Sequence, residues 1–389
     1  MRIHWVLAVW LSVGILPAQV GHTTIVFNDP SRTGGFGSGG GPGRQIQTEI
    51  YYPATVTGDD TPIRPGLYPI VIIGHGFVMV WSAYQNLWEA LVPAGYIVAL
   101  PRTEGSLSPS HQDFALDMQI VANRMLLEGK DPNSRFYGHI HPKVAITGHS
   151  MGGGCAVLAA QQFPNVHCIV GFAPANTNPS AIIAAANVTV PALIFSGSGD
   201  SVTPPYQHQL PIYQALSSSC KWYVSLLGGG HCYFANPNFN CDFGESSAGS
   251  TITISRAQQQ SFTTRILLPF LNACLKDSCM GKFLDTLSTI SGITYQSACP
   301  YQPLSVSGQI THPTYSNPSG GSITLTVVGG TPPYQYQWSH GFTGSDPTGL
   351  SAGIYSVQVR DAAGCEVIQT FVLSLTSSLY EDGKKPFIV

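Results

Sequence analysis

Gly148-His149-Ser150-Met151-Gly152-Gly153 is the stretch that decides the interpretation of this sequence. An apolar run with β-strand character, residues 144–147, precedes it, and a run with helical spacing, residues 155–162, follows it. Glycines around a serine between a strand and a helix predict a sharp turn, because only small residues let the neighbouring backbones approach closely. The N-terminus of the following helix would stabilise negative charge that develops at the serine. The stretch therefore predicts a strand–turn–helix unit with Ser150 as a nucleophile.

Two further residues lie where a serine nucleophile needs its partners. A serine hydroxyl is a poor nucleophile at neutral pH and requires an imidazole base, which a carboxylate orients. Asp200 follows an expected strand at 192–196, and His231 follows another at 222–227 after three glycines. We therefore predict Ser150, Asp200 and His231 as the catalytic residues, in the chain order serine, acid, histidine. Asp242 is the rival acid, but it follows the histidine.

Two backbone N–H groups are candidates for stabilising a tetrahedral oxyanion. One belongs to Met151, immediately after the predicted nucleophile, and the other to Phe77, in the turn 74–77 after an expected strand at 68–73. We expect both residues to line the substrate-binding pocket as well. The histidines beside these two turns are predicted to be structural: His75 and His149.

Strand-like and helix-like runs alternate through the first 300 residues. Short β-rich runs occur at 46–51, 68–73, 96–100, 143–147, 168–172, 192–196 and 222–227. Runs with helical spacing, such as 81–91 and 111–127, fall between them. This alternation predicts an α/β fold, with a mostly parallel sheet covered by helices on both faces.

The pattern changes near residues 299–300. Beyond this point, runs that alternate apolar and polar residues are separated by Gly, Pro and Asp turns, at 322–327, 334–338, 355–359 and 366–373. They predict a small Ig-like β-sandwich. We therefore divide the chain into a signal peptide (1–20), a catalytic domain (21–300), a β-sandwich domain (301–379) and a tail (380–389).

The N-terminus predicts export. Arg2 supplies a positive charge, residues 6–16 are almost entirely apolar, and small residues follow, as in a secretory signal. The apolar run is too short to span a bilayer, and no later run reaches the ~18 residues that a transmembrane helix needs.

The composition narrows the class of partner. Lys and Arg number 17 and Asp and Glu 20, so the net charge is −3, and only 10% of residues are charged. This balance argues against nucleic acid or an anionic membrane as the main partner, since both favour a basic excess.

Gly (42) and Pro (29) form about 18% of the chain, against roughly 12% in globular proteins. Seven glycines lie within residues 34–43, which we interpret as a flexible lead-in because the ending of a phosphate loop is missing.

Nine cysteines in an exported chain predict disulfides, with an odd cysteine left over. Cys232 and Cys241 close a loop short enough to bridge. One pair is expected among three cysteines near the end of the first domain: Cys274, Cys279 and Cys299. For the three in apolar surroundings, a buried thiol and a bridge remain equally open: Cys155, Cys168 and Cys365. No cluster with the spacing of metal ligands is found in the sequence.

The run Gly148-His149-Ser150-Met151-Gly152-Gly153-Gly154 resembles the nucleophile turn of bacterial cutinases and polyester hydrolases. The run Asp200-Ser201-Val202-Thr203-Pro204, followed by Gln207, His208, Pro211 and Tyr213, resembles that family's acid loop. The resemblance covers residues 45–299. It implies an α/β-hydrolase fold, the triad Ser150, Asp200 and His231, the oxyanion donors Phe77 and Met151, and no organic cofactor. The implied activity is hydrolysis of esters, including cutin-like or aromatic polyesters such as PET.

The sequence departs from this family at two places. Phe77 stands where the family usually has Tyr, and Phe172-Ala173-Pro174-Ala175 stands where it usually has Trp. Fewer aromatic contacts would therefore hold an extended substrate. Chlorophyllase-like and dienelactone-hydrolase-like esterases also resemble the turn 74–77.

The C-terminal part resembles the repeat of gliding-motility surface adhesins. The residues that carry this resemblance are Gly329-Gly330-Thr331-Pro332-Pro333-Tyr334, Gly353-Ile354-Tyr355 and residues 359–365. The tail Asp382-Gly383-Lys384-Lys385-Pro386 resembles the lead-in to a type IX secretion sorting domain. Both imply a secreted protein, or one attached to the bacterial cell surface through its C-terminal part.

Three functional hypotheses follow. The first is a secreted serine hydrolase of small or polymeric carboxylic esters. The second keeps the fold and the triad but cleaves amides, since only the handling of the leaving group differs. The third is a surface-binding protein whose hydrolase domain is catalytically idle, and the intact triad positions argue against it.

Overall fold

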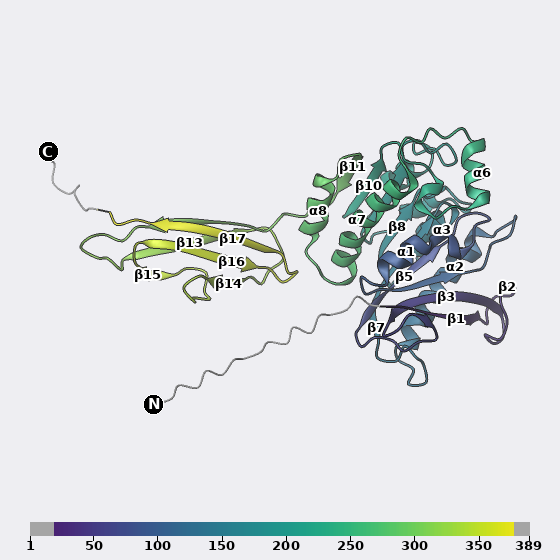
Figure 1. Ribbon diagram of the computed structural model, residues 1–389, viewed down its shortest axis with the longest axis horizontal. Coiled ribbons are helices and arrows are strands. Elements are labelled where there is room, and N and C mark those ends of the chain that lie inside the picture. The colour runs from purple at the N-terminus through teal and green to yellow at the C-terminus, as the bar shows by residue number, and fades with distance from the viewer. Residues whose placement is uncertain (1–18, 377–389) are drawn as a thin grey trace, which may run out of the picture.

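The computed structural model describes residues 19–376 and consists of two parts (Figure 1). The larger part holds an 11-stranded sheet, and the smaller part holds two three-stranded sheets. The predicted α/β class with an additional β-sandwich is therefore confirmed. Within the described residues, no helix is both long enough and apolar enough to cross a membrane.

Six parallel strands form the centre of the large sheet. In spatial order they are β10 (Lys221–Leu226), β9 (Ala192–Gly197), β8 (Val166–Phe172), β7 (Ile140–His149), β5 (Tyr68–Gly74) and β6 (Ile97–Pro101). Antiparallel strands flank them: β11 (Ile293–Ala298) beside β10, and β3 (Arg44–Ala54) beside β6, followed by β1 (Gln19–Asp29). Two short strands complete the sheet, β2 (Gly35–Phe36) and β4 (Gly58–Asp59). The parallel strands are buried on both faces, which explains their nearly continuous apolar sequences.

Each face of the sheet has its own hydrophobic core. On β5, Ile70 and Ile72 face one core, while Val71 and Ile73 face the other, as the two-residue period of a strand requires. The first core is covered by α2 (His111–Glu128), α3 (Met151–Ala160), α4 (Ala181–Ala185) and α5 (Gln209–Ala215). The second is covered by η1 (Trp81–Tyr84), α1 (Gln85–Leu91), α7 (Arg256–Leu275) and α8 (Met280–Thr289). Between β10 and α7 lie η2 (Cys232–Phe234) and α6 (Phe239–Ser247).

Strand β1 was not predicted from the sequence. It pairs with β3 along its whole length, from Gln19 opposite Ala54 to Asp29 opposite Arg44. The glycine-rich stretch 34–43 connects these two strands, so its interpretation as a flexible lead-in was wrong. The Gln45 side chain holds the stretch in place through hydrogen bonds with its backbone. Most of the predicted signal peptide, residues 1–18, lies outside the described residues.

The smaller part is a sandwich of two antiparallel sheets. One sheet contains β12 (Ser305–Thr311), β13 (Gly321–Val328) and β15 (Thr348–Leu350). The other contains β14 (Gln335–Trp338), β16 (Gly353–Arg360) and β17 (Glu366–Leu373). Trp338, Val357 and Phe371 pack with Ile323 in the core between them. The predicted tail 380–389 lies outside the described residues.

Three disulfides are present, one closing a short loop and two joining distant parts of the chain. The predicted Cys232–Cys241 bridge is present. The pair expected among Cys274, Cys279 and Cys299 was wrong, because the bridges are Cys220–Cys299 and Cys279–Cys365. The antiparallel pairing of β10 with β11 places Lys221 opposite Ala298, and this brings Cys220 and Cys299 together. The free cysteines among the described residues are Cys155, Cys168 and Cys274, where one odd cysteine was expected.

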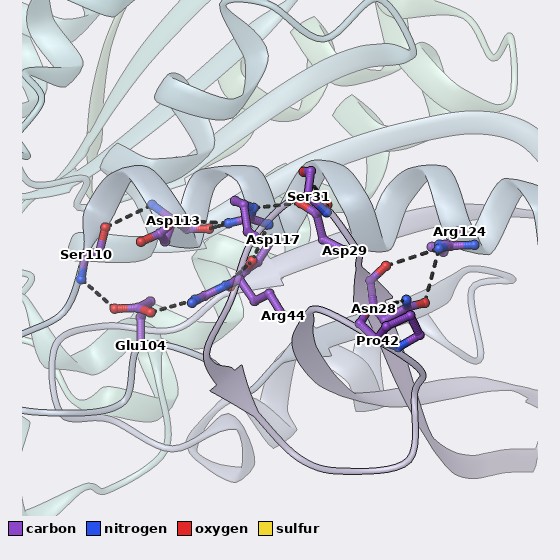
Figure 2. A network of polar contacts seen from close by, with 11 residues as sticks. Asn28, Asp29, Ser31, Pro42, Arg44, Glu104, Ser110, Asp113, Asp117 and Arg124 are labelled. Atoms are coloured by element: carbon purple, nitrogen blue, oxygen red, sulfur yellow. Dashed lines mark hydrogen bonds and ion pairs between the residues drawn. The ribbon is translucent and has the colours of Figure 1, made fainter.

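A buried ionic network fastens the β1–β3 pair to helix α2 (Figure 2). The Asp117 carboxylate, fully buried on α2, accepts hydrogen bonds from the Arg44 guanidinium at 2.8 and 3.1 Å and from Arg32 at 2.7 Å. Arg44 also reaches Glu104 at 2.6 Å, in the loop after β6. Glu104 in turn accepts the backbone N–H of Ser110, the N-cap of α2. The network therefore joins the edge of the sheet to a loop at its carboxyl end.

A second buried carboxylate makes stability dependent on pH. Glu49, on β3, accepts hydrogen bonds from His22 (2.8 Å), Thr24 (2.7 Å) and Arg102 (2.9 Å). Burial acts to raise its pKa, but these hydrogen bonds outweigh burial and lower the pKa from 4.5 to about 2. Since ionised Glu49 is favoured in the folded state, its contribution to stability is present above pH 4.5 and is lost as the pH falls towards 2.

We therefore expect Glu49→Gln to reduce the acid sensitivity of folding. The melting temperature of the wild type should fall between pH 5 and pH 2, and that of Glu49→Gln should fall less steeply over this interval. Melting followed by circular dichroism at half-unit pH steps measures both slopes. Parallel slopes for the two proteins would contradict this assignment.

Candidate active site

Ser150 lies on a strained turn between β7 and α3. Its backbone has φ 54° and ψ −118°, a conformation that costs free energy for a residue with a side chain. Its N–H donates to the Phe172 carbonyl at 3.0 Å. A Cβ atom at Gly148 would collide with the backbone of Gly152, and one at Gly152 would collide with the backbone of Gly74. The glycines are therefore required for the turn and for its contact with the loop after β5.

Asp200 and His231 form a buried pair. The Asp200 Oδ2 and His231 Nδ1 atoms are 2.8 Å apart, and their side chains are almost completely buried. Asp200 follows β9 and His231 follows β10, so both lie at the carboxyl edge of the sheet, as Ser150 does. An N–H on Nδ1 facing the carboxylate leaves Nε2 as the basic nitrogen of the imidazole.

The Asp200 carboxylate is held by the segment that follows it. Oδ1 accepts the backbone N–H groups of Val202 at 2.9 Å and Thr203 at 2.8 Å. Oδ2 accepts the Thr203 hydroxyl at 2.9 Å, and that hydroxyl accepts the side-chain amide of Gln209 at 3.0 Å. The hydrogen bonds fix the orientation in which the carboxylate meets His231.

The backbone around His231 is fastened by side chains. Glu245, buried on α6, accepts the N–H of His231 on one carboxylate oxygen and that of Cys232 on the other, the latter at 3.2 Å. Gln259, on α7, bonds to both the N–H and the carbonyl of Gly230, at 2.9 and 2.8 Å. Burial raises the pKa of Glu245. Neither contact could be predicted from the sequence, because no motif marks these two residues.

His149 links the serine turn to the His231 loop. Its Nε2–H donates to the His231 carbonyl at 2.9 Å, and the two rings lie 4.8 Å apart between centroids. In the described part of the chain, the hydrogen bonds of His231 run to Asp200, Thr203, Glu245 and His149, and none involves the Ser150 hydroxyl. Catalytic hydrogen bonds of this kind are often long before substrate binds.

The two predicted oxyanion donors have free N–H groups. Within residues 19–376, no hydrogen bond uses the backbone N–H of Phe77 or of Met151. For Met151 this follows from its position as the first residue of α3, where helical N–H groups have no partner. The close approach of Gly152 to Gly74 brings the two turns against each other. The Phe77 side chain is 46% exposed, while Met151 is buried.

A hydrogen-bonded chain connects the Phe77 turn with His231. The Tyr84 hydroxyl accepts the N–H of Gly76 at 2.7 Å and lies 3.0 Å from Nδ1 of His149. Burial, and then repulsion from His231, holds the pKa of His149 well below its usual range. A neutral His149 that donates through Nε2 has a bare Nδ1, which accepts the Tyr84 proton. His149 was predicted to be structural, and the role of Tyr84 was missed because a buried tyrosine carries no sequence signal.

We expect Tyr84→Phe to reduce kcat about tenfold with little change in KM. Removing the hydroxyl leaves the Gly76 N–H and His149 Nδ1 unpaired in the interior, which costs about 1–3 kcal/mol and loosens both turns. Tyr96→Phe is the matched control, because Tyr96 is equally buried and its hydroxyl donates to Asn272 at 2.7 Å, away from the site. Steady-state kinetics on a soluble ester and melting curves compare them. Equal losses of kcat in both variants would contradict a specific role for Tyr84.

One group of potential metal ligands occurs among the described residues: Cys232, Asp242 and Glu245. The sulfur of Cys232 is in a disulfide, and Asp242 pairs with Arg256 at 2.6 Å. The rival acid Asp242 is therefore held by Arg256, whereas Asp200 contacts His231.

The sheet order and the strained serine turn define an α/β-hydrolase. The chain belongs to the PET hydrolase-like family, whose model matches residues 12–247, more than half of the chain. In the C-terminal part, residues 317–343 match the SprB repeat. These matches confirm the resemblance to polyester hydrolases and the resemblance to the adhesin repeat.

Several characterised hydrolases are similar to this chain. A bis(hydroxyethyl) terephthalate hydrolase of Streptomyces coelicolor is 30% identical over 184 residues, which are 47% of this chain and 54% of the relative. Cutinase est1 of Thermobifida alba is 27% identical over 219 residues, 56% of this chain and 66% of the relative. Cutinase 2 of Thermobifida cellulosilytica is 28% identical over 223 residues, 56% of this chain and 74% of the relative. The chain thus spans only about half to three quarters of the length of these relatives.

Proposed function

We propose that this protein is a secreted serine hydrolase of carboxylic esters, with Ser150 as nucleophile, His231 as general base and Asp200 as the acid that orients it. The observation that carries the proposal is the buried Asp200–His231 pair at 2.8 Å, at the same edge of the sheet as the strained Ser150 turn. Strain of this kind persists where the surrounding structure enforces it, and it is common at catalytic residues.

The proposed reaction is acyl transfer in two steps. His231 Nε2 takes the proton of the Ser150 hydroxyl as its oxygen attacks the ester carbonyl, and the N–H groups of Phe77 and Met151 stabilise the oxyanion. His231 then protonates the departing alcohol, which leaves an acyl-enzyme. Water, activated by the same imidazole, attacks the acyl-enzyme and releases the acid. The Asp200 carboxylate stabilises the imidazolium in both steps.

We propose neutral, apolar esters as substrates, including polyesters. The backbone N–H of Phe77 is a proposed oxyanion donor, and the half-exposed ring of the same residue offers an apolar contact for the group next to the scissile bond. Among the relatives, one is named for hydrolysis of bis(hydroxyethyl) terephthalate and others are named cutinases. The SprB repeat supports a location outside the cell or on its surface, with attachment through the C-terminal part. Export by the type IX pathway is part of the same proposal.

Parallel assays of three bond types test this function. Purified protein is incubated with p-nitrophenyl butyrate, with the matching p-nitroanilide, and with amorphous polyester film. We expect fast turnover of the ester, turnover of the anilide at least about a hundredfold slower, and release of soluble monomer from the film. Preferential anilide cleavage would indicate an amidase, and no turnover of any of the three would indicate a catalytically idle domain.

A further inference from the structure

The most exposed large apolar side chains of the larger part lie in segments that follow the carboxyl ends of its parallel strands. Within residues 19–300, the five large apolar side chains with the highest exposure are Leu107, Ile183, Tyr206, Phe239 and Phe243. Each lies in a segment that leaves the carboxyl end of a parallel strand: β6, β8, β9 and, for both phenylalanines, β10. These strand ends also carry Ser150, Asp200 and His231, and a hydrogen bond and a disulfide tie α6, which carries Phe239 and Phe243, to the loop of His231.

Helix α6 carries two of these side chains side by side. Their ring centroids lie 6.2 Å apart and their planes are nearly parallel. Despite this contact, Phe239 is 83% exposed and Phe243 is 65% exposed. They are four residues apart and therefore project from the same face of the helix. Two adjacent exposed rings on one face form an apolar surface larger than the isolated apolar residues that proteins usually expose.

This surface is rigidly attached to the catalytic loops. The Cys232–Cys241 bridge joins α6 to the residue after His231, and Glu245 of α6 binds the N–H of His231. On the other side, the Asn240 side chain donates to the Val78 carbonyl at 2.9 Å, next to the oxyanion donor Phe77. The two rings are thus held beside the candidate active site, and Figure 1 shows α6 at the outer boundary of the larger part.

The exposed face of α6 carries no unpaired charge. In the segment 233–254 the only ionisable carboxylates are Asp242, which pairs with Arg256, and Glu245, which is buried. The exposed residues of the helix are Phe239, Asn240, Phe243, Ser246 and Ser247. A surface with two flat rings and no unpaired charge suits a neutral, flat and apolar partner, whereas an anionic lipid surface would favour basic residues.

We propose that α6 is a docking surface by which the enzyme holds a solid polyester, with Phe239 and Phe243 as the contact residues. The inference rests on the proposed function and extends it from a soluble ester to a polymer surface. Because α6 is bridged to the His231 loop, adsorption through these rings keeps the candidate active site next to the polymer. A segment of polymer that leaves the surface then reaches Ser150 without diffusion of the protein.

Adsorption of a catalytically inactive protein tests this proposal independently of turnover. In a Ser150→Ala background, Phe239→Ser/Phe243→Ser is compared with Tyr137→Ser on amorphous poly(ethylene terephthalate) nanoparticles. Tyr137 is an exposed aromatic residue that precedes β7, at the amino end of the sheet. We expect the double variant to bind about 10- to 100-fold more weakly and Tyr137→Ser to bind as the parent does. With Ser150 intact, release of monomer should fall in parallel, while turnover of p-nitrophenyl butyrate changes less than twofold.

Several outcomes would overturn the proposal. One is that the parent protein does not adsorb, and another is that the parent and the double variant adsorb equally. A third is that the double variant loses turnover of the soluble ester and of the polymer equally, which would mean that α6 only supports the His231 loop. Loss of binding to neutral phospholipid vesicles without loss on the polymer would assign the surface to lipid. A change of oligomeric state in sedimentation would assign it to a second copy of the chain. Failure of the wild type on the soluble ester would remove the proposed function, and the adsorption result would still stand.

Discussion

Replacing Ser150 with alanine is expected to reduce turnover of p-nitrophenyl butyrate by roughly 10⁴- to 10⁶-fold, because the proposed acyl-enzyme cannot form without the Ser150 hydroxyl. The proposed oxyanion donors, the N–H groups of Phe77 and Met151, remain, so a small rate above that of water should persist. Melting temperature should be retained or rise slightly, since alanine adopts the strained conformation of residue 150 no worse than serine does. Initial rates with milligram amounts of the variant measure the residual activity.

Ser196→Ala provides the matched control for this experiment. Ser196 is buried on β9, two strands from the Ser150 turn, and its hydroxyl donates to Tyr223 at 2.8 Å. We expect this variant to lose some stability and to keep its kcat within a few-fold of the wild type. A Ser150→Ala protein with more than about one hundredth of the wild-type rate would contradict the role given to Ser150.

The second large effect is expected on stability. Asp117→Ala should lower the free energy of unfolding by about 3–5 kcal/mol, because it leaves the Arg44 guanidinium buried without its main partner. Asp113→Ala is the control: Asp113 binds the same Arg32 at 3.1 Å, but its side chain is partly exposed, and its loss should cost about 1 kcal/mol or less. Guanidinium unfolding followed by tryptophan fluorescence gives both values.

A double variant separates the effect of the buried charges from the effect of side-chain volume. Arg44→Met/Asp117→Leu removes both charges while keeping apolar volume, so it should recover much of the stability lost in Asp117→Ala. If the free energy of unfolding of Asp117→Ala lay within about 1 kcal/mol of the wild-type value, the network would be shown not to contribute to stability.

The central strands could be predicted from the sequence because burial on both faces requires continuous apolar residues. Residues 68–73 and 192–196 are examples, and both runs lie within strands of the observed sheet. Edge strands obey weaker rules. β1 has one face towards solvent and contains polar residues such as His22 and Thr24, so its sequence does not distinguish it from a loop.

The geometry of the site depends on contacts between residues far apart in the sequence. The motif around Ser150 is local, and so is the turn that holds the Asp200 carboxylate through Thr203. In contrast, Tyr84 meets His149 across 65 residues, and Cys220 meets Cys299 across 79. Such pairs can be predicted only when the order of the strands in the sheet is known. The hydrogen bond from the His231 backbone N–H to Glu245 likewise depends on how α6 folds back against the loop.

Covalent labelling tests the central claim most directly. The protein is treated with a fluorophosphonate, which reacts with an activated serine, and the modified residue is located by tandem mass spectrometry. We predict one adduct, on Ser150, with labelling strongly reduced in His231→Ala and slowed in Asp200→Asn, because both residues are proposed to activate the hydroxyl. An adduct on another serine, or labelling of Ser150 that does not depend on His231, would contradict the proposed catalytic site.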